Sequence, residues 1–320
     1  MTGLAAQVLI LAAGIGVLYF GAEWLVRGAA RLAGSLGVSP IVVGLTVVSF
    51  GTSAPELVVA VVAAIRGNAE LAIGNVLGSN LANIGLILGL TALITPLAVA
   101  ARVVWREVPL MLLVTLAIFP LAWDGALGRV DGALLLLGLA GYLAFVFRSV
   151  KEETPEILGE YREYVEAEGE TAPRVSATDV ALVVLGCAAL VVGGYAIVES
   201  AVFVAGYLGV SQVVIGLTVV AVGTSLPELA TSLVAAMRKE ADIAVGNVIG
   251  SNIFNVLAIL GAASSIRPLA VAETILFREL IAVVAMSLVV FPMLWTGWRI
   301  QRWEGGVLLA CYLGLAIWLL

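Results

Sequence analysis

The chain has 320 residues, of which 62% are apolar and only 12% are charged, and its formal net charge is −6. So few charged side chains cannot cover the surface of a soluble domain, so the composition excludes an ordinary soluble protein and predicts an all-α integral membrane protein. The absence of histidine removes the commonest general base and metal ligand, and the acidic balance argues against nucleic acid as a partner.

Apolar segments of roughly 20 residues, the length that crosses a bilayer core, follow one another along the chain and predict ten transmembrane helices. Five lie in the first half, at 7–33, 41–65, 72–94, 106–122 and 130–148. Five lie in the second half, at 179–207, 213–237, 243–265, 277–294 and 304–320. We expect the first segment to be retained as a span, because it is too long for a signal peptide and lacks an obvious cleavage site.

The basic residues predict how these spans are oriented. With ten spans both termini lie on one side of the membrane, and the connections after the odd-numbered spans lie on the other. That second side carries twelve of the sixteen Lys and Arg residues, and the side of the termini carries four. The positive-inside rule therefore places the short acidic loop 149–178 in the cytoplasm and both termini outside, and we expect a multi-pass protein of the plasma membrane.

An internal repeat divides the chain into two halves, 1–148 and 179–320. The core motif 44–89 aligns without a gap with 216–261 at an offset of 172 residues, and 27 of the 46 aligned positions are identical. Each half holds five spans, and because five is odd, the halves must cross the membrane in opposite orientations. Two such inverted repeats are the usual architecture of secondary transporters, whose site lies near the membrane midplane.

Spans 2 and 7 each carry a carboxylate near their middle. The first reads GLTVVSFGTSAPELVVAVVAAI with Glu56, and the second reads GLTVVAVGTSLPELATSLVAAM with Glu228. A carboxylate at this depth costs several kcal/mol unless it is solvated or paired, and no Lys or Arg lies at comparable depth in either repeat. The pattern therefore predicts a bound cation between the two glutamates.

The prolines before these glutamates, Pro55 and Pro227, predict that helices 2 and 7 are broken. A broken helix exposes backbone carbonyls, which is tolerated at membrane depth only inside protein or beside a water-filled cavity. We expect the released carbonyls to belong to Ser49, Phe50, Ala221 and Val222. Hydroxyl oxygens on the same turns come from Thr52, Ser53, Thr224 and Ser225.

Spans 3 and 8 add a second set of oxygens, in the segments GNVLGSNLAN and GNVIGSNIFN. Ser79 and Asn83 lie four residues apart on one helical face, as do Ser251 and Asn255. Such residues more often bond one helix to another, but the double occurrence in symmetry-related spans favours ion binding. An all-oxygen set suits hard ions such as Ca²⁺ and Na⁺, and its two carboxylates neutralise one Ca²⁺, several Na⁺ or two protons.

Other polar residues have simpler interpretations. Glu23, Arg27 and Glu199 in spans 1 and 6 are expected to anchor the spans at the interface or to pair between spans. Cys187 and Cys311 lie in apolar runs and predict neither a disulfide nor a metal site, and we expect no cofactor. A cation channel or an intramembrane enzyme would also use buried polar groups, but Ser53 and Ser225 have no histidine to activate them.

These motifs resemble those of the cation/calcium exchanger superfamily, specifically its prokaryotic Na⁺/Ca²⁺ exchanger branch, along all ten spans. GTSAPE with GSNLAN and GTSLPE with GSNIFN are similar to the two repeats of that family. The resemblance implies an antiporter, not an enzyme, that exchanges Ca²⁺ for Na⁺ at about 3 Na⁺ per Ca²⁺ by alternating access, with spans 1 and 6 sliding. It implies ligation by Ser49, Thr52, Ser53, Glu56, Ser79, Asn83, Ala221, Thr224, Ser225, Glu228, Ser251 and Asn255, with Ser49 and Ala221 contributing carbonyls.

Asn255 is the informative departure, because several prokaryotic members and the K⁺-dependent exchangers have aspartate there. Asparagine is similar to the K⁺-independent members, so the resemblance implies that K⁺ is not required. The central loop is too short for the Ca²⁺-sensing domains of animal members, so no such regulation is expected. A Ca²⁺/H⁺ antiporter and a K⁺-dependent Na⁺/Ca²⁺ exchanger remain the alternatives within the superfamily, and the oligomeric state is left open.

Overall fold

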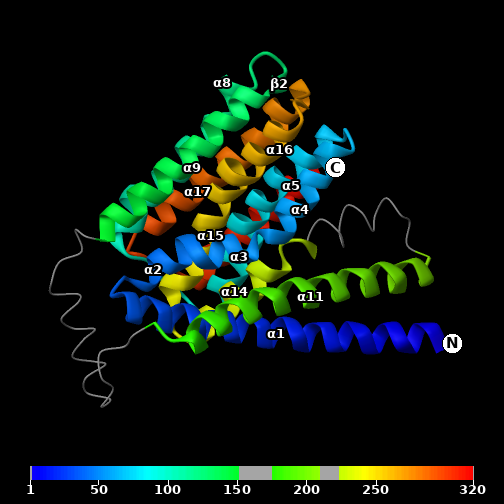
Figure 1. Ribbon diagram of the computed structural model, residues 1–320, viewed down its shortest axis with the longest axis vertical. Helices are drawn as coiled ribbons and strands as arrows, with labels where there is room; N and C mark the ends of the chain where they lie inside the picture. The colour runs from blue at the N-terminus through cyan, green and yellow to red at the C-terminus, as the bar shows by residue number, and fades with distance from the viewer. Residues whose placement is uncertain (1, 151–174, 210–222, 320) are drawn as a thin grey trace.

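The computed structural model describes residues 2–150, 175–209 and 223–319 and is almost entirely helical (Figure 1). The first half contains π-helical turns, denoted η, between its α-helices. In chain order its elements are α1 (Thr2–Leu36), α2 (Pro40–Val43), η1 (Gly44–Val48), α3 (Ser49–Thr52), α4 (Ala54–Ile65), α5 (Ala69–Ala82), η2 (Asn83–Ile87), α6 (Leu88–Ile94), β1 (Leu97–Ala98), η3 (Val103–Glu107), α7 (Val108–Leu116), α8 (Ile118–Leu121), β2 (Ala126–Leu127) and α9 (Arg129–Val150).

The second half repeats many of these bounds at the offset of 172 residues. Helix α4 recurs as α14, α5 recurs as α15, and the π-helical turn η3 recurs as η6. Its elements are α11 (Ala177–Tyr207), α14 (Leu226–Met237), α15 (Ala241–Phe254), η5 (Asn255–Leu260), α16 (Gly261–Ile266), β3 (Leu269–Ala270), η6 (Ile275–Glu279), α17 (Leu280–Trp295), β4 (Arg299–Ile300) and α18 (Arg302–Leu319).

The described part of the chain contains seven helices that are long and apolar enough to cross a membrane, or eight if the bent segment at 40–65 is counted as one span. The predicted span 213–237 is represented only by α14, because residues 210–222 lie outside the described part. The predicted span 304–320 corresponds to α18, which has 18 residues. The protein is therefore a multi-pass membrane protein, and its full count of ten spans remains a prediction.

The predicted break in helix 2 is confirmed. The axes of Pro40–Thr52 and Ala54–Ile65 differ by 47°. Ser53 lies between them with φ −82° and ψ 7°, and Pro55 occupies the first turn of α4, where a missing N–H costs no hydrogen bond. In the second half Ser225 has nearly the same dihedrals, φ −88° and ψ 7°, and Pro227 lies in the first turn of α14.

Helices α1 and α11 form a long pair along one face of the molecule, and both run across the slanted helices of the remainder (Figure 1). Glycines bring the two backbones together. A Cβ atom at Gly186 would lie 2.6 Å from the backbone nitrogen of Leu25, and one at Gly193 would lie 2.7 Å from that of Leu18. Small residues at such crossings allow the close packing that helices in lipid require.

The interior of the molecule is formed mainly by α5 and α15 with the helical turns that follow them. An 18-residue stretch of Ala241–Ile266 is 94% buried and one of Ala69–Ile94 is 72% buried, whereas the corresponding stretch of Gly3–Leu36 is only 11% buried. The helices that carry the GSN motifs are therefore enclosed by protein, while that stretch of α1 is mostly exposed.

Two short antiparallel strand pairs join the halves reciprocally. Strand β1 pairs with β4, with Leu97 opposite Ile300, and β2 pairs with β3, with Leu127 opposite Leu269. Spans 3 and 8 carry the GSN motifs, and each strand pair involves the connection that follows one of them. Its partner strand lies in the other half, in the connection after span 9 or span 4 respectively. The chain thus brings the connections after predicted spans 3 and 9 together, and also those after spans 4 and 8.

Candidate cation site

The two glutamates of the repeats are buried in the interior, and each accepts a hydrogen bond from the other half. Glu56 is 0% exposed and Glu228 is 1% exposed. Ser53 Oγ donates to Glu228 Oε1 at 3.1 Å, and Ser225 Oγ donates to Glu56 Oε1 at 3.4 Å. Because the serine and the glutamate of each motif bond across the repeat interface, the first turns of α4 and α14 face each other over one shared site.

Each glutamate also has a second oxygen without a hydrogen-bond partner, Oε2 in both cases. The described Lys and Arg side chains form no salt bridge with either carboxylate; the ion pairs seen involve Glu23 and Asp179 instead. Burial without a counter-charge is strongly unfavourable for an ionised carboxylate. The arrangement therefore suits a mobile cation as the partner of both.

Further unpaired buried atoms belong to residues that the sequence predicted as ligands. Both Asn83 and Asn255 begin π-helical turns, η2 and η5, which often mark functional sites. The described residues contain no group of three or more His, Cys, Asp or Glu side chains that could hold a metal ion, so the other predicted ligands near the glutamates offer neutral oxygens. Besides the two glutamates, the predicted ligands in the described part of the chain with unpaired buried atoms are Asn83 (Oδ1 and Nδ2), Thr224 (Oγ1), Ser251 (Oγ) and Asn255 (Oδ1).

The remaining predicted ligands have protein partners. Ser225 Oγ lies 3.4 Å from Ser79 Oγ, so Ser79 adjoins Glu56. Thr52 Oγ1 donates to Asn247 Oδ1 at 3.0 Å and approaches the Ser49 carbonyl at 3.3 Å. Ala221 lies outside the described residues.

In this conformation the Ser49 carbonyl keeps a backbone hydrogen bond, and its role as a ligand stays a prediction. That oxygen accepts the N–H of Ser53 at 3.0 Å, because α3 completes its last turn before the chain bends. Pro55 has no N–H, so the carbonyl that loses its helical hydrogen bond is that of Gly51, four residues before the proline, and not that of Ser49. The Ser49 side chain instead anchors α3 to α15, with Oγ 3.0 Å from the Asn247 carbonyl.

Sequence reasoning missed four asparagines in the same motifs. Asn75 and Asn247 bond the glutamate backbones, while Asn80 and Asn252 meet across the halves, with Asn80 Nδ2 donating to the Asn252 carbonyl at 3.2 Å. Their double occurrence at the offset of 172 was a usable signal. Asn75 also lies four residues before Ser79, on the same helical face.

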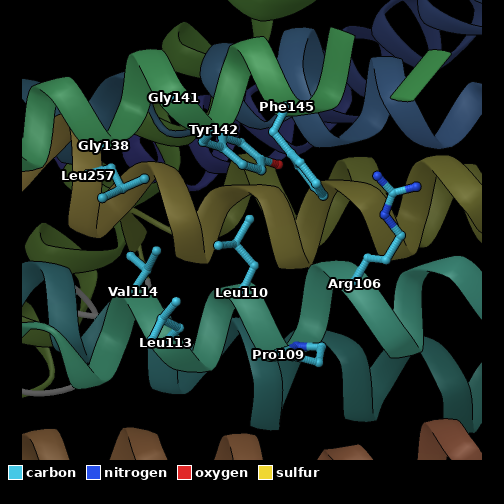
Figure 2. A pocket seen from close by; sticks show the side chains of 10 residues that line it. All are labelled: Arg106, Pro109, Leu110, Leu113, Val114, Gly138, Gly141, Tyr142, Phe145 and Leu257. Carbon is cyan, nitrogen blue, oxygen red and sulfur yellow. The ribbon is translucent and has the colours of Figure 1, made fainter. Parts of the chain in front are cut away.

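A separate cavity of about 550 Å³ lies between α7 and α9, with Leu257 of η5 in its wall (Figure 2). Its walls are mainly apolar and contain none of the predicted ligands, so it offers few oxygens to a hard ion. Arg106 lies at one end with its guanidinium carbon 4.7 Å from the centre of the Phe145 ring (Figure 2).

The expected pairing of the span 1 charges is confirmed for Glu23. Its carboxylate accepts a hydrogen bond from Arg238 Nε at 2.6 Å and forms an ion pair with a second nitrogen of that guanidinium. Arg27 contacts the same carboxylate at 3.2 Å. The pair connects α1 with the end of α14.

The fold defines a multi-pass membrane protein with two carboxylates buried in its interior, and comparison with known proteins specifies the family. The family model described as sodium/calcium exchanger protein matches residues 6–148 and 178–320. The chain therefore belongs to the sodium/calcium exchanger family, which comprises transporters rather than enzymes.

Individual relatives support the same assignment. The chain is 39% identical over 317 residues to the putative antiporter CaxA of Alkalimonas amylolytica, and the match covers 97% of both proteins. It is 35% identical over 340 residues to the sodium/calcium exchanger MaX1 of Methanosarcina acetivorans, again with 97% of both covered. It also matches a solved structure of the sodium-calcium exchanger NCX_Mj, with a TM-score of 0.82, 32% identity and 97% coverage of each chain.

Proposed function

We propose that this protein is a secondary active antiporter that exchanges Ca²⁺ for Na⁺, about 3 Na⁺ per Ca²⁺. The observation that carries the proposal is the pair of buried carboxylates, Glu56 and Glu228, each bonded to a serine of the other half and each with one unpaired oxygen. Two negative charges balance one Ca²⁺, and the same charges with neutral oxygens accommodate Na⁺ instead. Mutually exclusive occupancy of one site is the minimum that an antiporter needs.

The proposed ligands combine the two carboxylates with hydroxyl, amide and carbonyl oxygens of both halves. Unpaired buried atoms in six of them support this assignment, since a buried polar atom without a partner is costly and a cation supplies the partner. The proposed ligands are Ser49, Thr52, Ser53, Glu56, Ser79, Asn83, Ala221, Thr224, Ser225, Glu228, Ser251 and Asn255, with backbone carbonyls at Ser49 and Ala221.

The architecture that we propose has ten spans in two inverted halves, 1–148 and 179–320, with broken helices 2 and 7. The acidic loop 149–178 would lie in the cytoplasm and both termini outside the plasma membrane. One contact supports the placement of two of the connections on a common side of the membrane. The Arg267 side chain, after predicted span 8, donates to the Ile65 carbonyl at the end of span 2, and both positions fall on the outer side.

An asymmetry between the halves supports alternating access. Helix α1 packs along α14, whereas α11 makes hardly any contact with α4, which is the equivalent position. A symmetric molecule would show both contacts equally. We propose that this arrangement is one of two states, and that sliding of α1 and α11 across the other helices exposes the site to the opposite side.

The deciding experiment measures uptake of radioactive Ca²⁺ into proteoliposomes loaded with Na⁺, K⁺ or choline at equal pH. We expect uptake only with internal Na⁺, because an outward Na⁺ gradient must drive Ca²⁺ inward. External K⁺ should be dispensable, since Asn255 replaces the aspartate of K⁺-dependent exchangers. Uptake that is indifferent to Na⁺ would overturn the proposal.

Each alternative function predicts a different result. A Ca²⁺/H⁺ antiporter would take up Ca²⁺ after a pH jump without any Na⁺ gradient. A K⁺-dependent exchanger would need K⁺ together with Ca²⁺ outside. A cation channel would pass Ca²⁺ without a counter-ion, and its Ca²⁺ flux would not saturate with Ca²⁺ concentration as the uptake by an exchanger does.

A further inference from the structure

Asn75 and Asn247 hold equivalent positions in the two halves, one helical turn before Ser79 and Ser251. Asn247 Nδ2 donates to the backbone carbonyl of Glu228 at 3.3 Å, and Asn75 Nδ2 donates to that of Glu56 at the same distance. Neither asparagine belongs to the proposed ligands. Each one therefore ties the GSN helix of its half to the backbone of the glutamate in that half.

Asn247 makes two further bonds that Asn75 lacks. Its Nδ2 lies 3.0 Å from Ser232 Oγ, and its Oδ1 accepts the hydroxyl of Thr52 at 3.0 Å. The orientation of its amide follows from chemistry, because the Glu228 carbonyl can only accept and must face the NH₂ group. Asn247 is 0% exposed, whereas Asn75 is only part-buried.

Thr52 belongs to the first half but lies beside the Glu228 carboxylate of the second. A hydroxyl that donates its proton to an amide oxygen keeps its lone pairs for a cation. Asn247 thus connects the glutamate backbone of one half with a hydroxyl ligand of the other. In the equivalent position Thr224 Oγ1 has no partner, so the halves differ in this connection.

We propose that Asn247 and Asn75 are positioning residues of the cation site, which set the placement of Glu228 and Glu56 without contacting the ion. The inference rests on the proposed function and specifies what these residues control. A Ca²⁺ ion in the site needs both carboxylates at once, at about 2.3–2.6 Å, whereas each Na⁺ can be satisfied by one carboxylate with neutral oxygens. Correct placement therefore matters more for Ca²⁺ than for Na⁺, and Asn247 controls it more strongly than Asn75.

The test compares Asn247→Ala with wild type in two measurements, Ca²⁺ binding by calorimetry on the purified protein and exchange in proteoliposomes. In Asn247→Ala we expect the Ca²⁺ dissociation constant and the half-saturating Ca²⁺ concentration to rise about tenfold or more. The half-saturating Na⁺ concentration should change less than about threefold. A merely structural role would lower the maximal rate and leave both half-saturating concentrations unchanged, and that result would overturn the inference.

Matched variants keep the test decisive. Ser232→Ala removes one bond of Asn247 without affecting the glutamate, so Ca²⁺ binding should stay within about threefold of wild type. Asn75→Ala should raise the Ca²⁺ dissociation constant less than Asn247→Ala does. If Asn247→Ala does not fold, Asn75→Ala and Asn247→Gln carry the test, and an unchanged ratio of Ca²⁺ to Na⁺ half-saturation in both overturns the inference. Loss of Na⁺-driven uptake in wild type itself would count against the proposed function, while calorimetry still measures the role of Asn247.

Discussion

Ser53 and Ser225 each extend to the glutamate of the opposite half, so neither carboxylate is held by its own repeat alone. This reciprocity follows from the offset of 172 residues, which pairs Ser53 with Ser225 and Glu56 with Glu228. Two carboxylates that share a site without a basic neighbour repel each other. If the proposed cation binds there, it would stabilise the ionised pair, and the two serine–glutamate bonds would link ion occupancy to the contact between the halves.

Replacement of either glutamate by glutamine tests this dependence. We expect Glu56→Gln and Glu228→Gln each to lower Ca²⁺ uptake by more than about a hundredfold, because one carboxylate cannot balance a divalent ion. Uptake into Na⁺-loaded proteoliposomes is the measurement. Both variants should fold, with a thermal midpoint no lower than that of the ion-free wild type, because glutamine keeps the shape and removes a buried charge. Near-normal uptake in either variant would refute the site.

At the scale of elements, the two repeats form the equivalent turn with different residues. Between α4 and α5 the chain passes through Gly67 with φ +79°, and Asn68 caps α5 by accepting the N–H of Leu71. Between α14 and α15 the same positions are Lys239, with φ +67°, and Glu240, which makes no side-chain cap. The second turn is therefore locally less favourable, since lysine adopts positive φ at a cost and a cap is missing.

Glu240→Asn should stabilise the protein by about 0.5–1 kcal/mol, because the backbone at 240 resembles that at Asn68 and asparagine can cap α15. Burial and the neighbouring Asp242 raise the pKa of Glu240 above its ordinary value, against the opposing effect of Arg238. The folded state thus disfavours the ionised form, and this penalty appears as the pH rises above the ordinary glutamate pKa.

The measurement is thermal unfolding of the purified protein at about pH 4 and about pH 7. The increase in the free energy of unfolding caused by Glu240→Asn should be larger at the higher pH, where the wild-type protein is destabilised by the ionised Glu240 carboxylate. Asn68→Ala is the matched control and should destabilise by a similar amount at both values, because it removes the cap without a titrating group. An equal or smaller gain at the higher pH would contradict the explanation.

At the scale of the whole molecule, the position of α1 distinguishes the two halves. The α1–α11 pair lies against α14 and leaves α4 almost without contact to α11. The ion pair between Glu23 and Arg238 fastens this arrangement at the end of α14. The Arg238 side chain is 38% exposed, so solvent weakens the pair, and in the proposed sliding movement it would bias the equilibrium rather than lock it.

We expect Glu23→Gln and Arg238→Gln each to change the maximal exchange rate by about two- to fivefold, which corresponds to about 0.5–1 kcal/mol. The double variant should equal either single one, because both changes break the same contact. Exchange assays on the three variants measure this coupling. Arg27→Gln is the control and should change the rate less, since Arg27 contacts the carboxylate from within α1. Independent, multiplicative effects of Glu23→Gln and Arg238→Gln would show that the pair does not control the movement.

Much of the architecture and the site followed from local patterns. Glu56 and Glu228 stand out because an isolated carboxylate in an apolar span needs a partner, and the bend at Ser53 follows from Pro55, which lacks an N–H. The GTSxPE and GSNxxN segments by themselves indicate the family. Asn75 and Asn247 were not predicted, because they donate to backbone carbonyls on another helix and residue spacing does not reveal such contacts.

By itself, the sequence determined that the protein crosses a membrane repeatedly, that it is duplicated, and that each copy supplies one carboxylate with nearby oxygens. These properties depend on hydropathy and on residues a few positions apart. Only the tertiary structure decided that Ser53 faces Glu228 rather than Glu56, that the Ser49 carbonyl keeps its partner, and that α1 packs on α14. The reason is that such contacts join residues as much as 215 positions apart, and their geometry depends on how whole helices pack rather than on local chain preference.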